Sequence, residues 1–284
     1  MDAHTTPHTT LPEGNYADLP NGRRIHFLDE GEGPVVVFLH GSGPGASGYS
    51  NFKGNYPALV NAGYRCIVPD LVGFGFSDKP DDVDYPLAFF VECVKQTLDA
   101  AGVERCCVVG NSLGGAGAIG LALDHPDCVE GLILMAPGGM SEREEYLAMP
   151  GMQKMFEIYL SEGGLNADSM RDLFCHGLVY DPAHVSDALL AERMHVMGLM
   201  NQQVMLTMDI PDLPERLSEL HCPILAFWGC NDQMMPESGL LALTRNARNM
   251  KLVVLSECGH WAMVEHEALF NRECLAFLGE LRAG

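Results

Sequence analysis

The sequence predicts an α/β fold, in which a mostly parallel, doubly wound sheet is interrupted by an inserted block of helices. Two observations support this prediction. Apolar, partly β-branched runs alternate with helix-compatible segments over residues 23–136, and the alternation resumes over residues 222–282. Residues 141–211, which lie between these stretches, show only helical, Met-rich patterns. Strands that alternate with helices form one parallel sheet with helices on both faces.

The expected elements can be read in order along the chain. Apolar or alternating runs bounded by turn residues predict strands at 23–29, 34–40, 64–68, 106–109, 128–136, 222–229 and 251–256. Helical patterns fall at 51–62, 85–102, 112–123, 238–246 and 261–282. We therefore predict a core domain formed by residues 1–140 and 211–284, and a helical cap formed by residues 141–210. Pro150 and Pro182 should divide this cap into separate helices.

Composition limits the class of partner. The formal net charge of −21 disfavours nucleic acid and anionic membrane surfaces as partners. No run of about 18 apolar residues is present, so we expect no transmembrane helix. The ten cysteines have no paired or metal-type spacing. They indicate reduced thiols in a cytoplasmic protein. No Walker A sequence and no His-Glu-x-x-His pair occurs, so no metal or other cofactor is expected.

The local motif with the clearest chemistry is G-x-S-x-G, formed by Gly110, Ser112 and Gly114. It lies between an expected strand and an expected helix. Two glycines at these positions allow a sharp turn that exposes the serine hydroxyl at the start of the helix, which is the geometry of a nucleophile. A Gly-Ser turn without function is the alternative for this pentapeptide taken alone.

Two later strand ends supply the partners that a nucleophilic serine needs. Asp232 follows the expected strand 222–229, and His260 follows the strand 251–256. A histidine takes the proton of the serine, and a carboxylate orients the histidine. The order Ser, Asp, His at successive strand ends is typical of one class of hydrolase, so we predict a catalytic triad of Ser112, Asp232 and His260.

The tetrahedral intermediate of such a reaction needs backbone N–H donors. Leu113, directly after the nucleophile, should supply one donor, and Ser42 in the loop 40–46 should supply the other. This loop also approaches a dinucleotide-binding fingerprint. However, Pro44 interrupts that fingerprint, and the first acidic residue at a following strand end, Asp70, comes too late in the chain.

Several linked motifs resemble one family over residues 20–282. They are HGSGPGASGYSNF (40–52), GNSLGG (110–115), LILMAPGG (132–139), LLAER (189–193) and CGHWAMVEH (258–266). The chain resembles the α/β-hydrolases, and within them the meta-cleavage product hydrolases. This resemblance implies an α/β-hydrolase fold, a homo-oligomer, and serine-dependent cleavage of a C–C bond in 2-hydroxy-6-oxo-2,4-dienoates from aromatic ring fission. It also implies that the substrate ketonises before an acyl-enzyme forms.

The resemblance also implies a polar pocket for the carboxylate and 2-oxo end of the substrate. Its members would be Gly41, Gly43, Asn51, Asn111, Arg193 and Trp261. Arg193 has independent support, because a guanidinium is the natural partner of a carboxylate and would offset the strongly negative charge of the protein. A surface arginine, or an ion pair with Glu192 or Asp187, is the alternative. Asn51 and Asn111 could instead be plain turn residues, and Asn51 could also cap a helix.

Apolar cap residues should meet the tail of the substrate. The candidates are Met149, Met152, Phe156, Phe174, Met194 and Met197. Methionines at helical spacing are more often core residues, so this alternative stays open. The chain also departs from the resemblance beside the acid, where Cys230, Asn231 and Gln233 replace a more charged run.

Other functions remain to be weighed against C–C hydrolysis. The runner-up is a carboxylesterase or lactonase with the same triad, which would not require Arg193, Asn51 and Asn111 together. A third reading is cofactor-free, non-hydrolytic chemistry or a ligand-binding receptor, although an intact triad disfavours a receptor. Haloalkane dehalogenase and epoxide hydrolase activities are disfavoured because the turn carries Ser112 rather than an aspartate.

Overall fold

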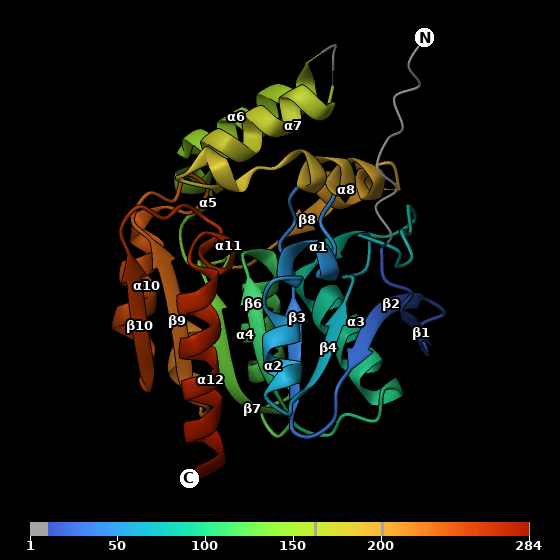
Figure 1. Cartoon of the computed structure of the whole chain (residues 1–284), viewed down its shortest axis with the longest axis vertical. Coiled ribbons are helices and arrows are strands. Elements are labelled where there is room, and N and C mark those ends of the chain that lie inside the picture. The colour runs from blue at the N-terminus through green and yellow to red at the C-terminus, as the bar shows by residue number, and fades with distance from the viewer. Residues whose placement is uncertain (1–10, 162–163, 200–201, 284) are drawn as a thin grey trace.

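The computed structural model describes residues 11–161, 164–199 and 202–283, and in these the chain forms a sheet of eight strands (Figure 1). The strand order is β1-β2-β4-β3-β6-β7-β9-β10. The strands are β1 (Asn15–Asp18), β2 (Arg24–Glu30), β3 (Val35–Leu39), β4 (Arg65–Pro69), β6 (Cys106–Asn111), β7 (Val129–Met135), β9 (Ile224–Gly229) and β10 (Met250–Leu255). β2 is antiparallel to β1 and β4, and the other neighbouring pairs are parallel. The predicted fold class is confirmed.

Helices cover both faces of this sheet. They are α1 (Gly48–Phe52), α2 (Tyr56–Asn61), α3 (Leu87–Ala100), α4 (Leu113–Asp124), α10 (Glu237–Asn246), α11 (Ala262–Glu265) and α12 (Glu267–Ala283). Alternate side chains of β3 belong to the hydrophobic cores on opposite faces of the sheet. Val37 and Leu39 pack with residues of α3 and α4, whereas Val36 and Phe38 pack with residues of α2 and α12. This is the doubly wound arrangement.

A second group of helices connects β7 to β9. It comprises α5 (Arg143–Ala148), α6 (Pro150–Leu160), α7 (Ala167–Leu173), a π-helical turn (Phe174–Leu178), a 3-10 turn (Pro182–His184), α8 (Asp187–Met197) and α9 (Gln202–Thr207). Figure 1 shows α6, α7 and α8 above the upper edge of the sheet, where the parallel strands end. The division at residues 140 and 211 into core and cap remains our prediction, and this arrangement supports it.

Several predicted boundaries are wrong for local reasons. The helix expected at 51–62 is two helices, because the chain turns at Gly54 and Asn55 between α1 and α2. The helix expected from residue 85 begins at Leu87, since β5 (Tyr85–Pro86) pairs with β8 (Met208–Asp209) in a small parallel sheet. The last helix is interrupted at His266.

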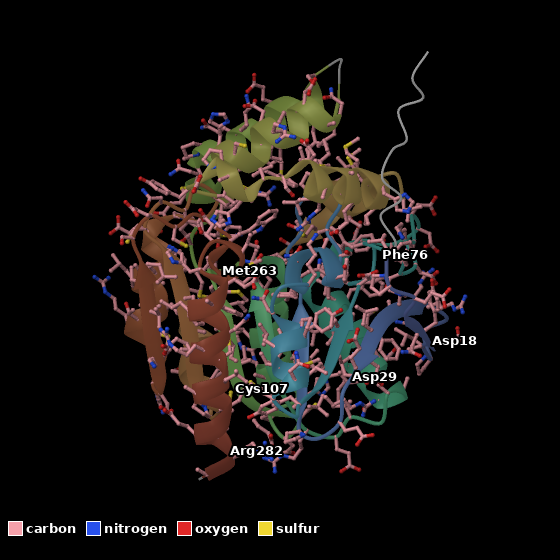
Figure 2. All side chains as sticks on the ribbon, in the orientation of Figure 1. Asp18, Asp29, Phe76, Cys107, Met263 and Arg282 are labelled. Atoms are coloured by element: carbon pink, nitrogen blue, oxygen red, sulfur yellow. The ribbon has the colours of Figure 1, made fainter. Side chains whose placement is uncertain are left out.

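The cysteines are unpaired, as their spacing predicts. All ten are free, and those in the sheet, such as Cys107, are buried among its side chains (Figure 2). Burial raises the pKa of the Cys66 thiol to about 12, which leaves it protonated and unreactive at neutral pH. Among the described residues, no helix is long and apolar enough to cross a membrane, and no cluster of metal-ligating side chains is found.

Candidate active site

Ser112 occupies a sharp turn between β6 and α4. Its φ of 55° lies in the left-handed region, which is strained for a non-glycine residue. The turn requires glycine on either side: a Cβ atom on Gly114 would lie 1.9 Å from the carbonyl oxygen of Leu39, and one on Gly110 would lie 2.3 Å from that of Gly114. The G-x-S-x-G motif therefore forms the tight strand-to-helix turn expected of an exposed nucleophile.

His260 and Asp232 form a buried pair beside this turn. His260 Nδ1 donates to Asp232 Oδ2 at 2.8 Å. The other oxygen of the carboxylate, Oδ1, accepts the N–H groups of Met234 at 2.7 Å and Met235 at 2.9 Å. These bonds fix the carboxylate, hold the proton on Nδ1, and leave His260 Nε2 as the basic nitrogen.

One cavity of about 300 Å³ brings the remaining predicted site residues together. Its lining includes Gly41, Ser42, Gly43, Asn51, Asn111, Ser112, Leu113, Arg193, His260 and Trp261. Asp232 is not part of the lining, because it contacts His260 at the ring nitrogen that the triad geometry turns away from substrate. The volume is at the lower end of the range for small-molecule sites.

The two candidate oxyanion donors lie at this cavity. Leu113 is the first residue of α4, and the first N–H groups of a helix have no acceptor inside the helix. Ser42 belongs to a loop held by His40, whose Nδ1 donates to the carbonyl oxygen of Gly41 at 2.7 Å. His40 Nε2 in turn accepts the N–H of Leu71 at 2.9 Å. A neutral His40 thus ties this loop to the segment after β4.

His40 predicts a pH dependence of stability. Burial lowers its pKa from 6.5 to about 4 in the folded state, whereas the unfolded chain takes up a proton below pH 6.5. The unfolded state therefore binds more protons between these values, and folding loses stability as the pH falls through this window. We expect a loss of roughly 3 kcal/mol from His40 alone. The free energy of unfolding, measured with denaturant at several pH values from 4 to 7, should depend less steeply on pH in His40→Gln than in the unaltered protein. An unchanged dependence on pH would contradict the prediction.

Arg193 on α8 is a buried cation in the lining of the cavity. Only 1% of its surface is exposed, and its guanidinium carbon lies 4.9 Å from the ring centre of Trp261 and 5.7 Å from that of Phe174. Nη2 donates to Asn51 Oδ1 at 2.8 Å, and Nε is buried without a partner. Burial lowers the pKa of Arg193 to about 10, so it stays charged at neutral pH.

The alternatives for Arg193 and Asn51 are wrong. The carboxylates that could have paired with Arg193 have other partners in the described part of the chain: Glu192 pairs with Lys53 at 2.6 Å, and Asp187 with Arg171. The cap of α1 is Ser47, so Asn51 does not cap it. Asn51 Nδ2 instead donates to Asn111 Oδ1 at 3.5 Å, which joins two predicted pocket residues.

The apolar part of the cavity agrees only in part with the sequence-based expectation. Of the six apolar candidates, Met152 and Phe156 line it. Phe174 packs against Trp261 instead, with ring centres 5.1 Å apart. The lining also includes residues that sequence reasoning did not place there: Arg143, Tyr146, Met155, Met205, Met208, Asp209, Ile210, Asp212, Met234 and Met235. Met234 and Met235 were detectable, because they lie two and three residues after the acid.

The uncharged residues beside Asp232 do not compete for its carboxylate. Gln233 Nε2 donates to the carbonyl oxygen of Asn231 at 3.1 Å. The N–H of Asn231 donates to the carbonyl oxygen of Cys258 at 2.9 Å. Cys230 is exposed. Asp232 therefore keeps two backbone donors and His260 as its partners despite the unusual sequence around it.

Comparison with known proteins identifies the family. The family model described as the alpha/beta hydrolase fold matches residues 34–267. A 2-hydroxy-6-oxononadienedioate/2-hydroxy-6-oxononatrienedioate hydrolase of Paraburkholderia phymatum is 35% identical and covers 97% of this chain and 99% of that protein. A 2-hydroxy-6-oxo-6-phenylhexa-2,4-dienoate hydrolase of Burkholderia cepacia is 35% identical and covers 90% of this chain and 91% of that protein.

Solved structures agree with these relatives. A meta-cleavage product hydrolase from Pseudomonas fluorescens superimposes with a TM-score of 0.82 at 29% identity, covering 94% of this chain and 98% of that chain. The chain belongs to the α/β hydrolases. Within them it is a member of the meta-cleavage product hydrolase family, and it is therefore an enzyme. The family that the sequence motifs suggest is confirmed.

Proposed function

We propose that this enzyme hydrolyses a C–C bond in 2-hydroxy-6-oxo-2,4-dienoates, with Ser112, His260 and Asp232 as its catalytic triad. The observation that carries the proposal is a buried, charged Arg193 in the same cavity as Ser112 and His260. A buried guanidinium without a carboxylate partner in the described chain is matched to an anionic substrate. A carboxylesterase or lactonase would not need it.

The chemistry of the substrate explains why the cation and the nucleophile share one cavity. Ketonisation moves a proton to C5 and gives a 2,6-dioxo-3-enoate, in which an electron pair released on C5 would be conjugated through the C3–C4 double bond with the C2 carbonyl. Ser112 loses its proton to His260 and attacks C6, and the backbone N–H groups of Ser42 and Leu113 stabilise the resulting oxyanion. The C5–C6 bond then breaks, and its electron pair is delocalised through the C3–C4 double bond to the C2 oxygen. Protonation of that oxygen gives a 2-hydroxy-2,4-dienoate as the leaving product. Water finally hydrolyses the acyl-serine to release the acid.

The polar residues fit the other end of this substrate. The C2 oxygen that gains charge is adjacent to the substrate carboxylate. Arg193, Asn51 and Asn111 together offer N–H donors for both groups, and Trp261 packs against the guanidinium. Gly41 and Gly43 let the loop backbone approach the substrate closely, since neither residue has a side chain in the cavity.

The test compares two substrates. We expect rapid bleaching of a synthetic 2-hydroxy-6-oxo-dienoate and slow hydrolysis of a p-nitrophenyl ester, because only the dienoate engages Arg193. Initial rates of both reactions, followed spectrophotometrically with the purified protein, provide the measurement. Rapid ester cleavage with an untouched dienoate would favour a carboxylesterase and contradict the proposal.

Two further properties belong to the same proposal. A homo-oligomer is implied by the resemblance to the family, and light scattering after size-exclusion chromatography would measure it. A cytoplasmic location is supported by the ten free cysteines, since thiols persist in reducing compartments.

A further inference from the structure

A second buried histidine–carboxylate pair is present in addition to His260 and Asp232. His26 Nδ1 donates to Asp70 Oδ2 at 2.9 Å, and the exposed fractions of the two residues are 6% and 2%. Neither residue is among the described residues that line the cavity. The pair therefore has the geometry of a catalytic dyad without access to substrate.

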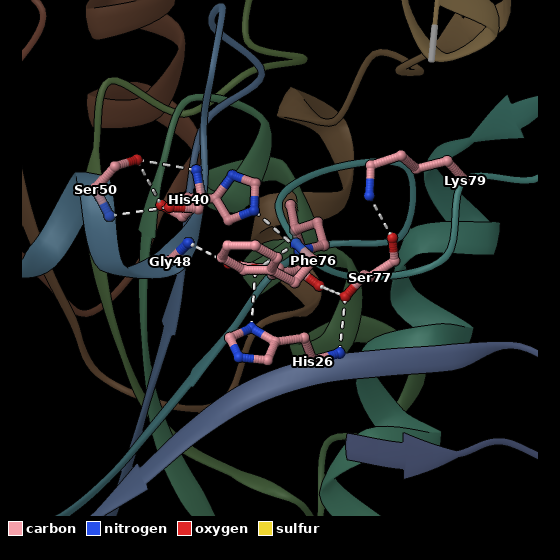
Figure 3. Close-up of polar contacts among 10 residues, drawn as sticks. His26, His40, Gly48, Ser50, Phe76, Ser77 and Lys79 are labelled. Atoms are coloured by element: carbon pink, nitrogen blue, oxygen red, sulfur yellow. Dashed lines mark hydrogen bonds and ion pairs between the residues drawn. The ribbon is translucent and has the colours of Figure 1, made fainter. Parts of the chain in front are cut away.

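The contacts around Asp70 show that this pair joins three segments of the chain. Asp70 Oδ1 accepts the N–H of Gly48 at 2.8 Å, and Oδ2 also accepts the N–H of Phe76 at 2.8 Å. The hydroxyl of Ser77 donates to the carbonyl oxygen of Asp70 at 2.6 Å and accepts the N–H of His26 at 2.9 Å. Figure 3 shows these contacts converging from β2, the start of α1 and the loop after β4.

Helix α1 depends on such contacts because it is short. It has only five residues, and helices of this length are not stable on their own. Two devices hold its first turn: the capping box of Ser47 and Ser50, and the Asp70 carboxylate on the N–H of Gly48. A carboxylate at this end of a helix also interacts favourably with the helix dipole. Asp70 thus fixes where α1 starts.

The position of α1 matters because it carries Asn51. Asn51 Oδ1 accepts from Arg193 Nη2 at 2.8 Å, and Nε of the same guanidinium has no partner. We propose that Asp70 is a positioning residue for substrate binding: through Gly48 and α1 it holds Asn51 where Asn51 orients Arg193 for the substrate carboxylate. This inference rests on the proposed function, since it assigns carboxylate recognition to Arg193.

Asp70→Asn is the variant that tests the proposal. An amide of the same size offers one acceptor oxygen, so it cannot accept from Gly48, Phe76 and His26 together. The matched control is Asp29→Asn, the same chemical change on β2. Asp29 pairs with Arg65 at 2.7 Å, and Figure 2 shows it nearer the lower end of the sheet than Phe76.

Binding is measured in the Ser112→Ala background, so that the result does not depend on turnover. The two ligands are a 2-hydroxy-6-oxo-dienoate and its methyl ester, which lacks the charge. Quenching of tryptophan fluorescence reports binding, because Trp261, one of two tryptophans in the chain, lines the cavity.

We expect Asp70→Asn to raise the dissociation constant of the acid at least tenfold and that of the methyl ester less than twofold. Asp29→Asn should change neither constant by more than twofold. In an Arg193→Ala background, Asp70→Asn should weaken binding of the acid by less than a further twofold, because both changes remove the same interaction.

Three outcomes would overturn the proposal. In the first, Asp70→Asn weakens binding of the acid and of the ester equally. In the second, Asp29→Asn weakens binding of the acid as much as Asp70→Asn does. In the third, Asp70→Asn and Arg193→Ala together raise the dissociation constant of the acid by the product of their separate effects.

If Asp70→Asn does not fold, Ser50→Ala provides a second variant, because it removes part of the capping box that also holds α1. Ser50→Ala should weaken binding of the acid more than binding of the methyl ester. An equal effect on both ligands, or no effect, would overturn the proposal. If the acid binds tightly but the enzyme that retains Ser112 does not cleave it, only the proposed function is refuted.

Discussion

Replacement of Ser112 by alanine is expected to abolish cleavage of the dienoate, with a loss of at least a thousandfold in kcat. The strained turn at φ 55° places Ser112 in the lining of the cavity, and His260 and the oxyanion donors can act only on an oxygen at this place. The substrate should still bind, because Arg193, Asn51 and the apolar lining are unchanged. Single-turnover kinetics for the chemical step and fluorescence titration for the dissociation constant separate the two effects.

Ser141→Ala provides a matched control for this experiment. Ser141 lines the same cavity, but its hydroxyl contacts that of Ser238 at 2.9 Å and has no role in the proposed reaction. We expect less than about a threefold change in kcat, as is usual for a substitution away from the reacting atoms. If the Ser112→Ala variant kept more than a thousandth of the activity, acyl transfer could not occur on Ser112.

Replacement of Arg193 by alanine should have the second largest effect. We expect kcat/KM for the dienoate to fall about a hundredfold, mostly through KM, which corresponds to roughly 2.7 kcal/mol of lost charge-assisted bonding. A p-nitrophenyl ester has no carboxylate to lose, so its kcat/KM should change less than about threefold. Steady-state kinetics on both substrates provide the measurement.

Arg171→Ala distinguishes a specific loss from the removal of any cap arginine. Arg171 pairs with Asp187 at the surface and lies outside the cavity lining. Its replacement should leave both substrates unaffected within about twofold, because exposed ion pairs contribute little. Equal losses on dienoate and ester in Arg193→Ala would mean that Arg193 supports the packing of α8 and does not bind the carboxylate.

The predicted fold and triad depended on one regularity of parallel sheets. Ser112, Asp232 and His260 each follow an apolar run, and the carboxyl ends of parallel strands meet at one edge. Their order along the chain therefore indicated their proximity in space. The burial of Arg193 was not detectable in the same way, because helical periodicity does not say which surface a cap helix covers.

Other features escaped the sequence for different reasons. The pairing of β5 with β8 involves two residues from each strand, which is too short for a periodic pattern. The break between α1 and α2 has a signal in Gly54 and Pro57, but the apolar residues on both sides continue a helical spacing and so favoured a single helix. Asp70 was considered only as a failed part of a nucleotide fingerprint, since its contacts with His26 and Gly48 join distant parts of the chain.

The insertion of the helical block between β7 and β9 has a consequence for how such enzymes diversify. Leu132 of β7 pairs directly with Ile224 of β9, so the whole block is one long connection, or chain excursion, between two neighbouring strands of the sheet. The entropic cost of closing a chain excursion grows only by roughly 0.6 kcal/mol for each doubling of its length. Mutation can therefore lengthen or remodel this excursion at little cost to the sheet. New substrate ranges can arise there while the strand ends that carry Ser112 and His260 stay fixed.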